Sequence, residues 1–442
     1  MKLTKYVAII AIIVAIVAVG CRRSQAIPDD AELGSVPITL QFWNSWTGPD
    51  GDTLVAIVQE FNRTNPWRIT IEMDIVAAPQ LVAKLNTAFP TGEAAEILLQ
   101  NTARLPVINE FLIPQDDIFV NTALREDQFL SGHLDGCKFE DTLYIIPFQF
   151  SGIYLYWNRD LFRRFGFDPE RPPMNWEEYT YMAERMTDPA NNIFGTALTI
   201  TSAAQLNGVM VHAGGSAIIE VSPGRFRANF VGNQGYRDNL VWHKDLFDRE
   251  IAPMGVSLDP AFIAGQVALL PNGIWTAAGA DAAGVDFGIG KFFGNDARAG
   301  ISGFVTTTSI KSEYARRAAQ KFIEWWFTGN EGTNLARTGA GRWAFDIGFP
   351  ASYLPLINSP EYRQNERLQA LNPTSATLEG AMSPFTFFGN VADVTTALYQ
   401  EVCFSPAQGA ELQRVIDAAL ETAQRDAEAI IVQFHGANAL VR

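Results

Sequence analysis

The order of apolar and polar positions predicts alternating strands and helices at the start of the folded chain. In "VPITLQFW", Ile38, Leu40 and Phe42 alternate with other residues, which is typical of a half-buried strand. The following "GPDGDTLVAIVQEFNRTNP" has apolar residues at helical spacing and ends at an Asn-Pro pair, so we expect a helix there. "RITIEMDIV" then predicts a second strand. This succession indicates a βαβ unit, and therefore a parallel sheet with helices on its faces.

The same alternation continues along the chain. Residues 143–158 form a long apolar and aromatic extended stretch, and residues 299–310 form another strand-like run. "NWEEYTYMAERM" predicts a helix with Asn175 at its N-cap and Glu178 three residues later, the pattern of a capping box. Apolar stripes at helical spacing predict two more helices, one around Ala315 to Trp326 and one around Leu412 to Ala423.

Length and composition limit the class of protein. A chain of 442 residues is too long for one compact core and long enough for two lobes. Its hydrophobic content of 48% and aromatic content of 12% are typical of a well-packed globular protein. The formal net charge is −15 and no basic stripe occurs, so nucleic acid is excluded as a partner.

The N-terminal segment predicts export. "MKLTKYVAIIAIIVAIVAVGC" places two lysines before an apolar run that is too short to span a bilayer and suits a signal peptide. Small residues precede Cys21, as in the lipobox of bacterial lipoproteins. We therefore predict a signal peptide over residues 1–20, lipidation of Cys21, and a polar tether over residues 21–36. An uncleaved membrane anchor is the alternative, and in either case the body of the protein is extracytoplasmic and attached to a bacterial membrane.

The sequence carries little sign of catalysis or metal binding. The two remaining cysteines, Cys137 and Cys403, either pair or stay as separate buried thiols, and their spacing is not that of a zinc site. The four histidines have no metal-ligand spacing, and no nucleotide-binding, zinc-protease or nucleophile-elbow motif occurs. No Asp or Glu sits in a setting that indicates a raised pKa. We therefore expect no metal, no cofactor and no enzyme activity, although counting alone does not exclude a glycosidase-type carboxylate pair.

Aromatic residues at turns are the positive signal. Several lie beside Gly, Pro or Asn, outside periodic runs, where flat rings with polar rims suit the faces of sugar rings. Each one taken alone is more often a core residue, and the group is more persuasive than its members. We predict a ligand-binding set made of Trp43, Asn44, Trp46, Asp50, Phe148, Trp275 and Trp343.

Five segments carry a family resemblance: "ITLQFWNSWTGPDGDTLVAIVQEFNRTNP", "PFQFSGIYLYWNRDLFRRFGFDPERPPMNWEEY", "FIAGQVALLPNGIWTAAGA", "ARRAAQKFIEWWFTGNEGTNLARTG" and "GFPAS". Together they resemble the family 1 extracellular solute-binding proteins, the sugar-binding lipoproteins of ABC importers. The chain departs from the family pattern at "TGEAAEILLQ" and in reading Gly273-Ile274-Trp275 where Gly-Pro-Trp is frequent.

The resemblance implies an α/β protein with the two-lobed periplasmic-binding-protein fold, in which each lobe is a central sheet flanked by helices. The two lobes would close on the ligand by a hinge motion. The chain would cross between them about three times, near residues 147–153, 299–304 and 348–356. Gly152 and Gly303 are expected to absorb the hinge motion. The predicted N-terminal lobe comprises 37–148 and 303–350, and the C-terminal lobe comprises 149–302 and 351–442.

The resemblance also implies a function. The protein would be a monomer that binds a carbohydrate between its lobes and delivers it to ABC permease subunits. The Trp that ends the first strand, the "GPDG" helix start and the Trp of "NGIW" match cleft-lining positions of the family. The alternatives are an extracytoplasmic glycan-processing enzyme, or a glycan-binding or scaffold lipoprotein without a transport role.

Overall fold

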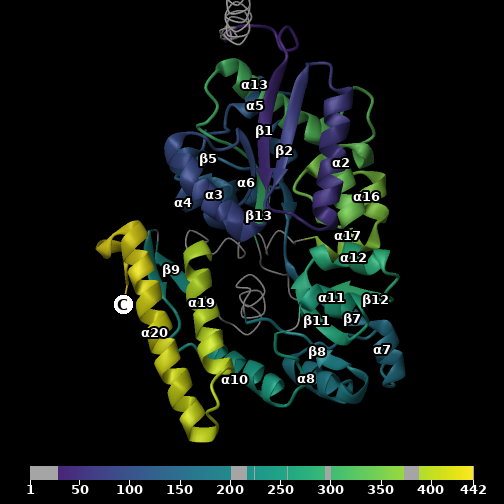
Figure 1. Ribbon diagram of the computed structural model, residues 1–442, viewed down its shortest axis with the longest axis vertical. Coiled ribbons are helices and arrows are strands. Elements are labelled where there is room, and N and C mark those ends of the chain that lie inside the picture. The colour runs from purple at the N-terminus through teal and green to yellow at the C-terminus, as the bar shows by residue number, and fades with distance from the viewer. Residues whose placement is uncertain are drawn as a thin grey trace, which may run out of the picture.

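The first lobe, in the upper half of Figure 1, is built on a sheet of five strands, and their order is β2-β1-β3-β13-β6. The computed structural model describes residues 28–200, 217–222, 224–255, 257–293, 300–372 and 388–441. β1 pairs in parallel with β2 and β3, whereas β13 runs antiparallel between β3 and β6. The strands are β1 (Ile38–Asn44), β2 (Ile69–Ile75), β3 (Ile97–Asn101), β6 (Ile146–Phe150) and β13 (Ile301–Thr306). The carboxyl ends of β1, β2, β3 and β6 therefore share one edge of the sheet.

Helices on both faces of this sheet complete the core. α2 (Pro49–Thr64) has Pro49 in its first turn and buries the predicted stripe that includes Leu54 and Phe61. α13 (Glu313–Thr328) buries Phe322 and Trp326 against the sheet, where both rings contact the ring of Phe304. The other elements of the lobe are α3 (Ala78–Thr91), α14 (Gly339–Arg342) and the π-helical turn η6 (Trp343–Ile347).

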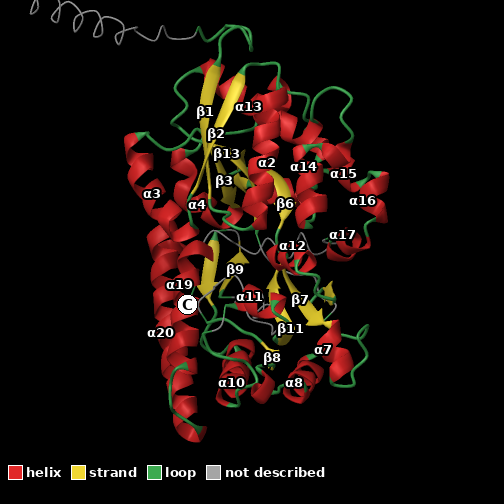
Figure 2. Cartoon of the chain, turned by 45° about the vertical axis from the view of Figure 1, so that its right-hand side comes forward, coloured by secondary structure: helices red, strands yellow, loops and turns green. Residues whose placement is uncertain are grey.

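The second lobe has a sheet of four strands in the order β12-β7-β11-β8 and a separate two-stranded ribbon, β9-β10. Its strands are β7 (Ile153–Asn158), β8 (Phe194–Thr196), β9 (Ile218–Ser222), β10 (Arg225–Ala228), β11 (Val267–Gly273) and β12 (Phe287–Gly290). Its helices are α7 (Arg159–Arg164), α8 (Trp176–Arg185), α10 (Gln234–Asp248), α11 (Leu258–Ile263), α12 (Trp275–Ala282), α19 (Phe388–Cys403) and α20 (Gly409–His435). Figure 2 shows α19 and α20 packed side by side along this lobe.

The start of α8 confirms half of the predicted capping box. The Asn175 side chain accepts a hydrogen bond of 2.8 Å from the backbone N–H of Glu178. The Glu178 carboxylate accepts from the N–H of Met174, one residue before the cap, instead of returning to Asn175. The N–H of Glu178 is therefore capped as predicted, while the Glu178 carboxylate fixes the chain one residue before the cap.

Short elements connect these layers. Around the first lobe they are η1 (Thr102–Arg104), α4 (Leu105–Ile108), η2 (Asn109–Phe111), α5 (Ile118–Asn121), η3 (Glu126–Gln128), α6 (Ser131–Gly136), β4 (Lys138–Phe139), β5 (Thr142–Leu143) and η5 (Leu335–Arg337). The remainder are η4 (Pro189–Asn191), α15 (Leu354–Ile357), α16 (Pro360–Gln364), α17 (Glu366–Leu371) and η8 (Ala437–Ala439).

The chain changes lobe within the stretch that the sequence presents as one extended run. β6 belongs to the first sheet and β7 to the second, with only Ser151 and Gly152 between them. β6 and β13 reach two residues past the predicted lobe boundaries at 148/149 and 302/303. Beyond the predicted boundary at 350/351, Ala351 still bridges Gln149 in the first lobe.

Gly303 does not have the position expected of a hinge. It lies in the interior of β13, opposite Gln100 on one side and Pro147 on the other. A Cβ at this residue would lie 2.1 Å from the carbonyl oxygen of Ile146. The glycine therefore permits close strand packing, and the expectation that it absorbs hinge motion is wrong.

The structure tests the prediction about the cysteines but not the prediction about the N-terminal segment. The signal peptide and the lipidation residue Cys21 lie outside the described residues. Within the described part of the chain, no helix combines the length and the apolar character needed to cross a bilayer. Cys137 and Cys403 are both buried and not bonded to each other, which decides between the two alternatives in favour of separate thiols. Burial raises the pKa of the Cys403 thiol to about 12.

Candidate functional site

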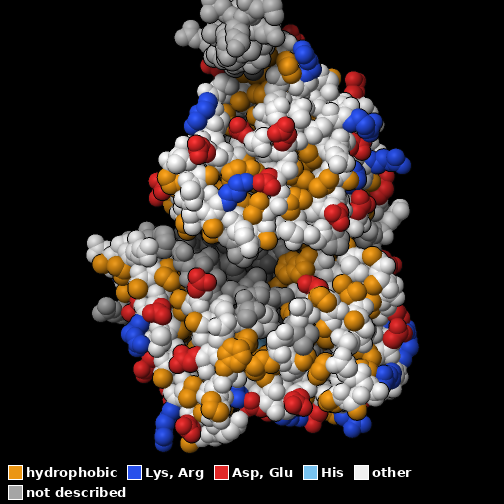
Figure 3. All heavy atoms as spheres, in the orientation of Figure 1, with side chains coloured by type: hydrophobic (Ala, Val, Ile, Leu, Met, Phe, Trp, Pro, Cys, Tyr) orange, Lys and Arg blue, Asp and Glu red, His pale blue; other side chains and the backbone are white. Residues whose placement is uncertain are grey.

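The candidate site lies where the two lobes face each other. Strand ends of the first sheet point toward the second lobe, and α12 at the top of the second lobe packs against both α2 and η6. Figure 3 shows the surface indented between the two lobes. In open α/β sheets, ligands bind outside the carboxyl ends of the strands, so this edge is the expected location of a ligand.

Three of the predicted aromatic residues form one cluster at this edge. The rings of Trp46 and Trp343 stack with centroids 4.8 Å apart and planes inclined by 23°. The Phe148 ring meets both edge-on, at 6.1 Å from Trp46 and 5.9 Å from Trp343. The indole N–H of Trp343 donates to the side-chain oxygen of Gln149. Trp343 is 1% exposed and Phe148 2%, whereas Trp46 is half-buried, so Trp46 is the ring of the cluster that solvent reaches.

The loop between β1 and α2 holds Trp46 in place. The Asn44 side-chain oxygen accepts a hydrogen bond of 3.0 Å from the Trp46 backbone N–H. A Cβ on Gly51 would lie 2.2 Å from the Trp46 carbonyl oxygen, so only glycine fits there. Asn44 is fully buried, yet its Nδ2 has no hydrogen-bond partner among the described residues. The structure thus brings a buried donor close to the aromatic cluster.

Asp50 lies in the first turn of α2. Its carboxylate accepts a hydrogen bond of 2.8 Å from the backbone N–H of Gly51. Burial raises the pKa of this carboxyl group, and the hydrogen bonds from the start of the helix lower it less. The expectation from the sequence that no carboxyl group has a raised pKa is therefore wrong at Asp50.

Trp43 lies apart from the cluster. It is 9% exposed, and the ammonium group of Lys84, from α3, lies 3.5 Å from the centroid of its ring. Lys84 also forms an ion pair of 2.6 Å with Asp74 on the neighbouring strand. Because side chains alternate along a strand, Trp43 and its neighbour Phe42 point to opposite faces of the sheet. The structure packs Trp43 against α3 and does not bring it into contact with Trp46.

Trp275 belongs to the second lobe. It is the first residue of α12 and is half-buried. A Cβ on Gly273 would lie 2.0 Å from the Trp275 ring, so the ring rests directly on the backbone at the end of β11. The helix that Trp275 begins packs on α2 and on η6, the elements that carry Asp50 and Trp343.

A polar cluster that the sequence pattern does not predict supports this end of β11. The Asp259 carboxylate accepts hydrogen bonds from the Asn272 amide at 2.8 Å and from the Thr276 hydroxyl. Burial raises the pKa of Asp259, although both hydrogen bonds oppose the shift. Nothing in the sequence pattern brings these residues together, because they come from α11, β11 and α12. In the part of the chain that the structure describes, no three His, Cys, Asp or Glu side chains are grouped so as to hold a metal ion.

Comparison with known proteins identifies the fold. The maltotriose-binding protein of Thermus thermophilus, solved with maltotriose, matches with a TM-score of 0.69 and 17% identity, over 88% of this chain and 100% of that one. The GacH receptor of Streptomyces glaucescens, studied with acarbose, matches with a TM-score of 0.73 and 16% identity, over 90% of this chain and 99% of that one. Both show the two-lobed arrangement that the sequence predicts.

Sequence comparison identifies the family. The sn-glycerol-3-phosphate-binding periplasmic protein UgpB of Escherichia coli K12 is 31% identical over 156 residues, which are 34% of this chain and 35% of that protein. The matched region thus spans about a third of the length of this curated relative. The family model described as bacterial extracellular solute-binding protein matches residues 56–346, more than half of the chain. The chain therefore belongs to the family of bacterial extracellular solute-binding proteins.

Proposed function

We propose that this protein is the receptor of an ABC importer, which captures a sugar or oligosaccharide between its lobes and presents it to the permease subunits. The observation that carries the proposal is the stacked pair of Trp46 and Trp343 at the strand ends of the first lobe. Trp275 begins the helix of the second lobe that packs on the same region. Aromatic faces with neighbouring donors and acceptors suit the C–H faces and hydroxyl groups of sugars.

Similar proteins support this choice of ligand class. The two structural neighbours were solved with maltotriose or acarbose, and the curated relative is named for sn-glycerol-3-phosphate. All three names describe small polyhydroxylated ligands. We extend this class, but no single ligand, to the present protein.

We infer binding without catalysis. A glycosidase needs two carboxyl groups placed roughly 5–9 Å apart on either side of the bond that breaks. Among the described residues, burial leaves a raised pKa at the carboxyl groups of Asp50 and Asp259. Asp259 is held by Asn272 and Thr276 within its own lobe. Asp50 is bonded to the first turn of its own helix. These hydrogen bonds indicate that Asp259 and Asp50 hold the local structure or contact the ligand, and that they do not transfer protons.

The receptor would be monomeric and held at the membrane through Cys21, after removal of residues 1–20. Replacing Cys21 by Ser should abolish incorporation of a radiolabelled fatty acid during expression in a bacterial host, because the serine hydroxyl is no substrate for lipid transfer. Cys137→Ser is the matched control and should label normally. Equal labelling of Cys21→Ser and the wild type would contradict the anchor.

A carbohydrate panel tests the proposed function directly. Thermal unfolding of the purified full chain is measured with mono-, di- and trisaccharides and with small polyols. A solute present at 100 times its Kd adds about 2.7 kcal/mol to the free energy of unfolding and raises the Tm. The shift should disappear in Trp46→Ala and persist in Trp67→Ala, because Trp67 is a half-buried tryptophan at the opposite end of the same sheet. A ligand that stabilises both variants equally would not be bound by the aromatic cluster.

A further inference from the structure

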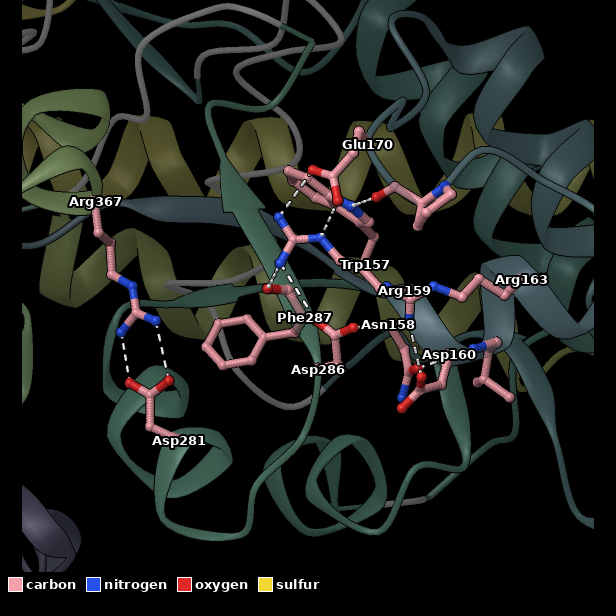
Figure 4. Close-up of polar contacts among 12 residues, drawn as sticks. Trp157, Asn158, Arg159, Asp160, Arg163, Glu170, Asp281, Asp286, Phe287 and Arg367 are labelled. Carbon is pink, nitrogen blue, oxygen red and sulfur yellow. Dashed lines mark hydrogen bonds and ion pairs between the residues drawn. The ribbon is translucent and has the colours of Figure 1, made fainter.

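Basic side chains that are buried or half-buried have oxygen partners throughout the described parts of both lobes. In Figure 4, Arg159 contacts Glu170 and Asp286, and Arg367 forms a bidentate ion pair with Asp281 at 2.6 and 3.0 Å. Oxygen partners also exist for Lys84, Lys138, Arg237, Lys244, Arg316, Arg317, Lys321 and Arg342, and Lys291 also has a partner.

Arg104 is the exception. Its side chain is half-buried, but it makes no hydrogen bond or ion pair with any residue in the described ranges. Burial lowers the pKa of its guanidinium group, and no acidic neighbour opposes the shift. A guanidinium group carries five N–H donors and is costly to remove from water without acceptors. An arginine in this state can accept an anion without first breaking an internal ion pair.

The position of Arg104 places it between the lobes. It ends η1, which follows directly on the carboxyl end of β3, and η1 lies against α19 of the second lobe. Figures 1 and 2 both show α3 and α4 directly above α19, so this edge of the first lobe faces the second lobe. Arg104 is thus on the same sheet edge as the aromatic cluster, at the side where α19 approaches.

Other donors at this edge are also without acceptors. β1 lies between β2 and β3, and Asn44 at its end has a fully buried Nδ2 without a partner in the described structure. α3, which follows β2, begins without a side-chain cap and without an acidic residue in its first turn. Helix N-termini of this kind favour negative charge. Three neighbouring strand ends therefore offer donors to an electron-rich group.

We propose that Arg104, assisted by Asn44, binds an acidic group of the transported solute, a carboxylate or a phosphate, while the sugar part of the solute lies against Trp46. The inference rests on the proposed function and narrows its substrate class to acidic sugars or acidic polyols. Recognition uses charge-assisted hydrogen bonds from the planar guanidinium group, which match both kinds of anion in a bidentate manner. A neutral sugar offers hydroxyl oxygens as acceptors but no negative charge, so it would leave the charge of the arginine without a counter-charge.

Inorganic phosphate tests the anion site without a sugar. The Tm of the full chain is measured in phosphate and in chloride buffers of equal ionic strength and pH. Phosphate should raise the Tm of the wild type relative to chloride, and the increase should vanish in Arg104→Gln and persist in Arg68→Gln. Arg68 lies at the opposite end of the sheet, just before β2, and its replacement changes the net charge equally. An equal increase in wild type and Arg104→Gln would overturn the site.

In chloride, Arg104→Gln should be at least as stable as the wild type, because it removes a half-buried charge that has no partner among the described residues. A large loss of stability in chloride would mean that Arg104 is a structural residue and would overturn the proposal. Arg104→Lys keeps the charge and should retain part of the phosphate effect, since a lysine can still donate but loses the bidentate geometry.

Matched pairs of solutes then test the substrate class. Calorimetry compares glucuronate with glucose, glucose 6-phosphate with glucose, and glycerol 3-phosphate with glycerol. One acidic member should bind at least tenfold more tightly than its neutral partner, and the preference should disappear in Arg104→Gln. Comparing the glucuronate pair with the two phosphate pairs shows whether the site binds a carboxylate or a phosphate.

The two proposals fail in different ways. If neutral sugars bind as tightly as acidic ones in the wild type, the anion site is overturned and the sugar receptor stands. If phosphate stabilises the protein through Arg104 but no saccharide or polyol binds, the anion site stands and the sugar receptor is overturned.

Discussion

The two edges that face each other between the lobes differ in how their polar groups are satisfied. On the first lobe, Asn44 Nδ2 and the Arg104 guanidinium group have no partner among the described residues. On the second lobe, Asp259, Asn272 and Thr276 are hydrogen-bonded to one another at the base of Trp275. Both edges are partly buried, so the difference is not one of exposure to solvent.

This difference assigns different tasks to the two edges. Donors without acceptors cost free energy in the empty protein and regain it when a ligand supplies oxygens. A satisfied cluster gains nothing from a ligand, but it fixes the backbone on which a recognition ring rests. We infer that the first lobe provides the polar recognition and that the second lobe provides a rigid platform for Trp275.

The largest effect is expected from replacing Trp343, which tests whether the aromatic cluster of the first lobe is part of its core. Trp343→Ala should lower the free energy of unfolding by about 3–5 kcal/mol, because a fully buried ring is lost and Gln149 loses its donor. Urea unfolding monitored by circular dichroism measures this change. Trp67→Ala, at the far end of the sheet, should cost much less because its ring is half-exposed. Equal losses in the two variants would contradict the distinction.

The next largest effect is the pH dependence of stability that one buried histidine in each lobe should cause. Burial lowers the pKa of His133 to about 3 and that of His243 to about 4. Unfolding restores the ordinary pKa of about 6.5, so the unfolded chain binds more protons between these values, and stability is lost as the pH falls below 6.5. Lowering the pH from 7 to 5 should cost about 2 kcal/mol per histidine.

Urea unfolding at pH 7 and pH 5 measures this loss. His133→Gln and His243→Gln should each lose about 2 kcal/mol less than the wild type over the same interval. The raised pKa values of Asp50 and Asp259 act in the opposite direction, since their contribution falls as the pH rises above the ordinary value of 3.8. The difference between wild type and variant is therefore the readout. If a variant loses as much stability as the wild type between pH 7 and pH 5, the histidine that it lacks must be protonated in the folded wild type.

The smallest effect on folding is expected at the platform of the second lobe. Trp275→Ala should reduce the free energy of solute binding by about 1–3 kcal/mol, by analogy with other aromatic stacking. Its unfolding free energy should change by less than about 1 kcal/mol, because the ring is half-buried and the polar cluster beneath it remains. Calorimetry with the best solute and urea unfolding of the same variant check both numbers. Normal affinity with a lowered unfolding midpoint would mean that Trp275 is a packing residue.

The sequence predicts local structure well where the apolar period is regular. β1, α2 and β2 were expected from alternation and from the Asn-Pro stop, and the structure confirms them. Alternation gives no information about which sheet a strand joins, so it presents β6 and β7 as one extended run, and the crossing near residues 147–153 was expected only from the family resemblance. For the same reason, Gly303 was taken as a hinge although it lies inside a sheet.

The candidate site was predictable only in part. Trp46 and Trp275 stand out because they sit beside Gly, Pro or Asn at predicted strand ends. Arg104 and Asp259 do not stand out, because what distinguishes them is the absence or presence of partners that are distant in sequence. Trp43 lies inside the strand and Trp46 in the loop that follows it, and the structure packs Trp43 beneath Lys84 and stacks Trp46 on Trp343.

The position of β13 has a consequence for the order of folding. β13 lies between β3 and β6, yet it follows them by about two hundred and by about one hundred and fifty residues, respectively. The first sheet therefore cannot assemble in its final order until β7 to β12 of the second lobe have been synthesised, and contacts so distant in sequence form slowly. Because this sheet closes late, the first lobe remains incompletely folded for longer than its N-terminal position in the chain suggests.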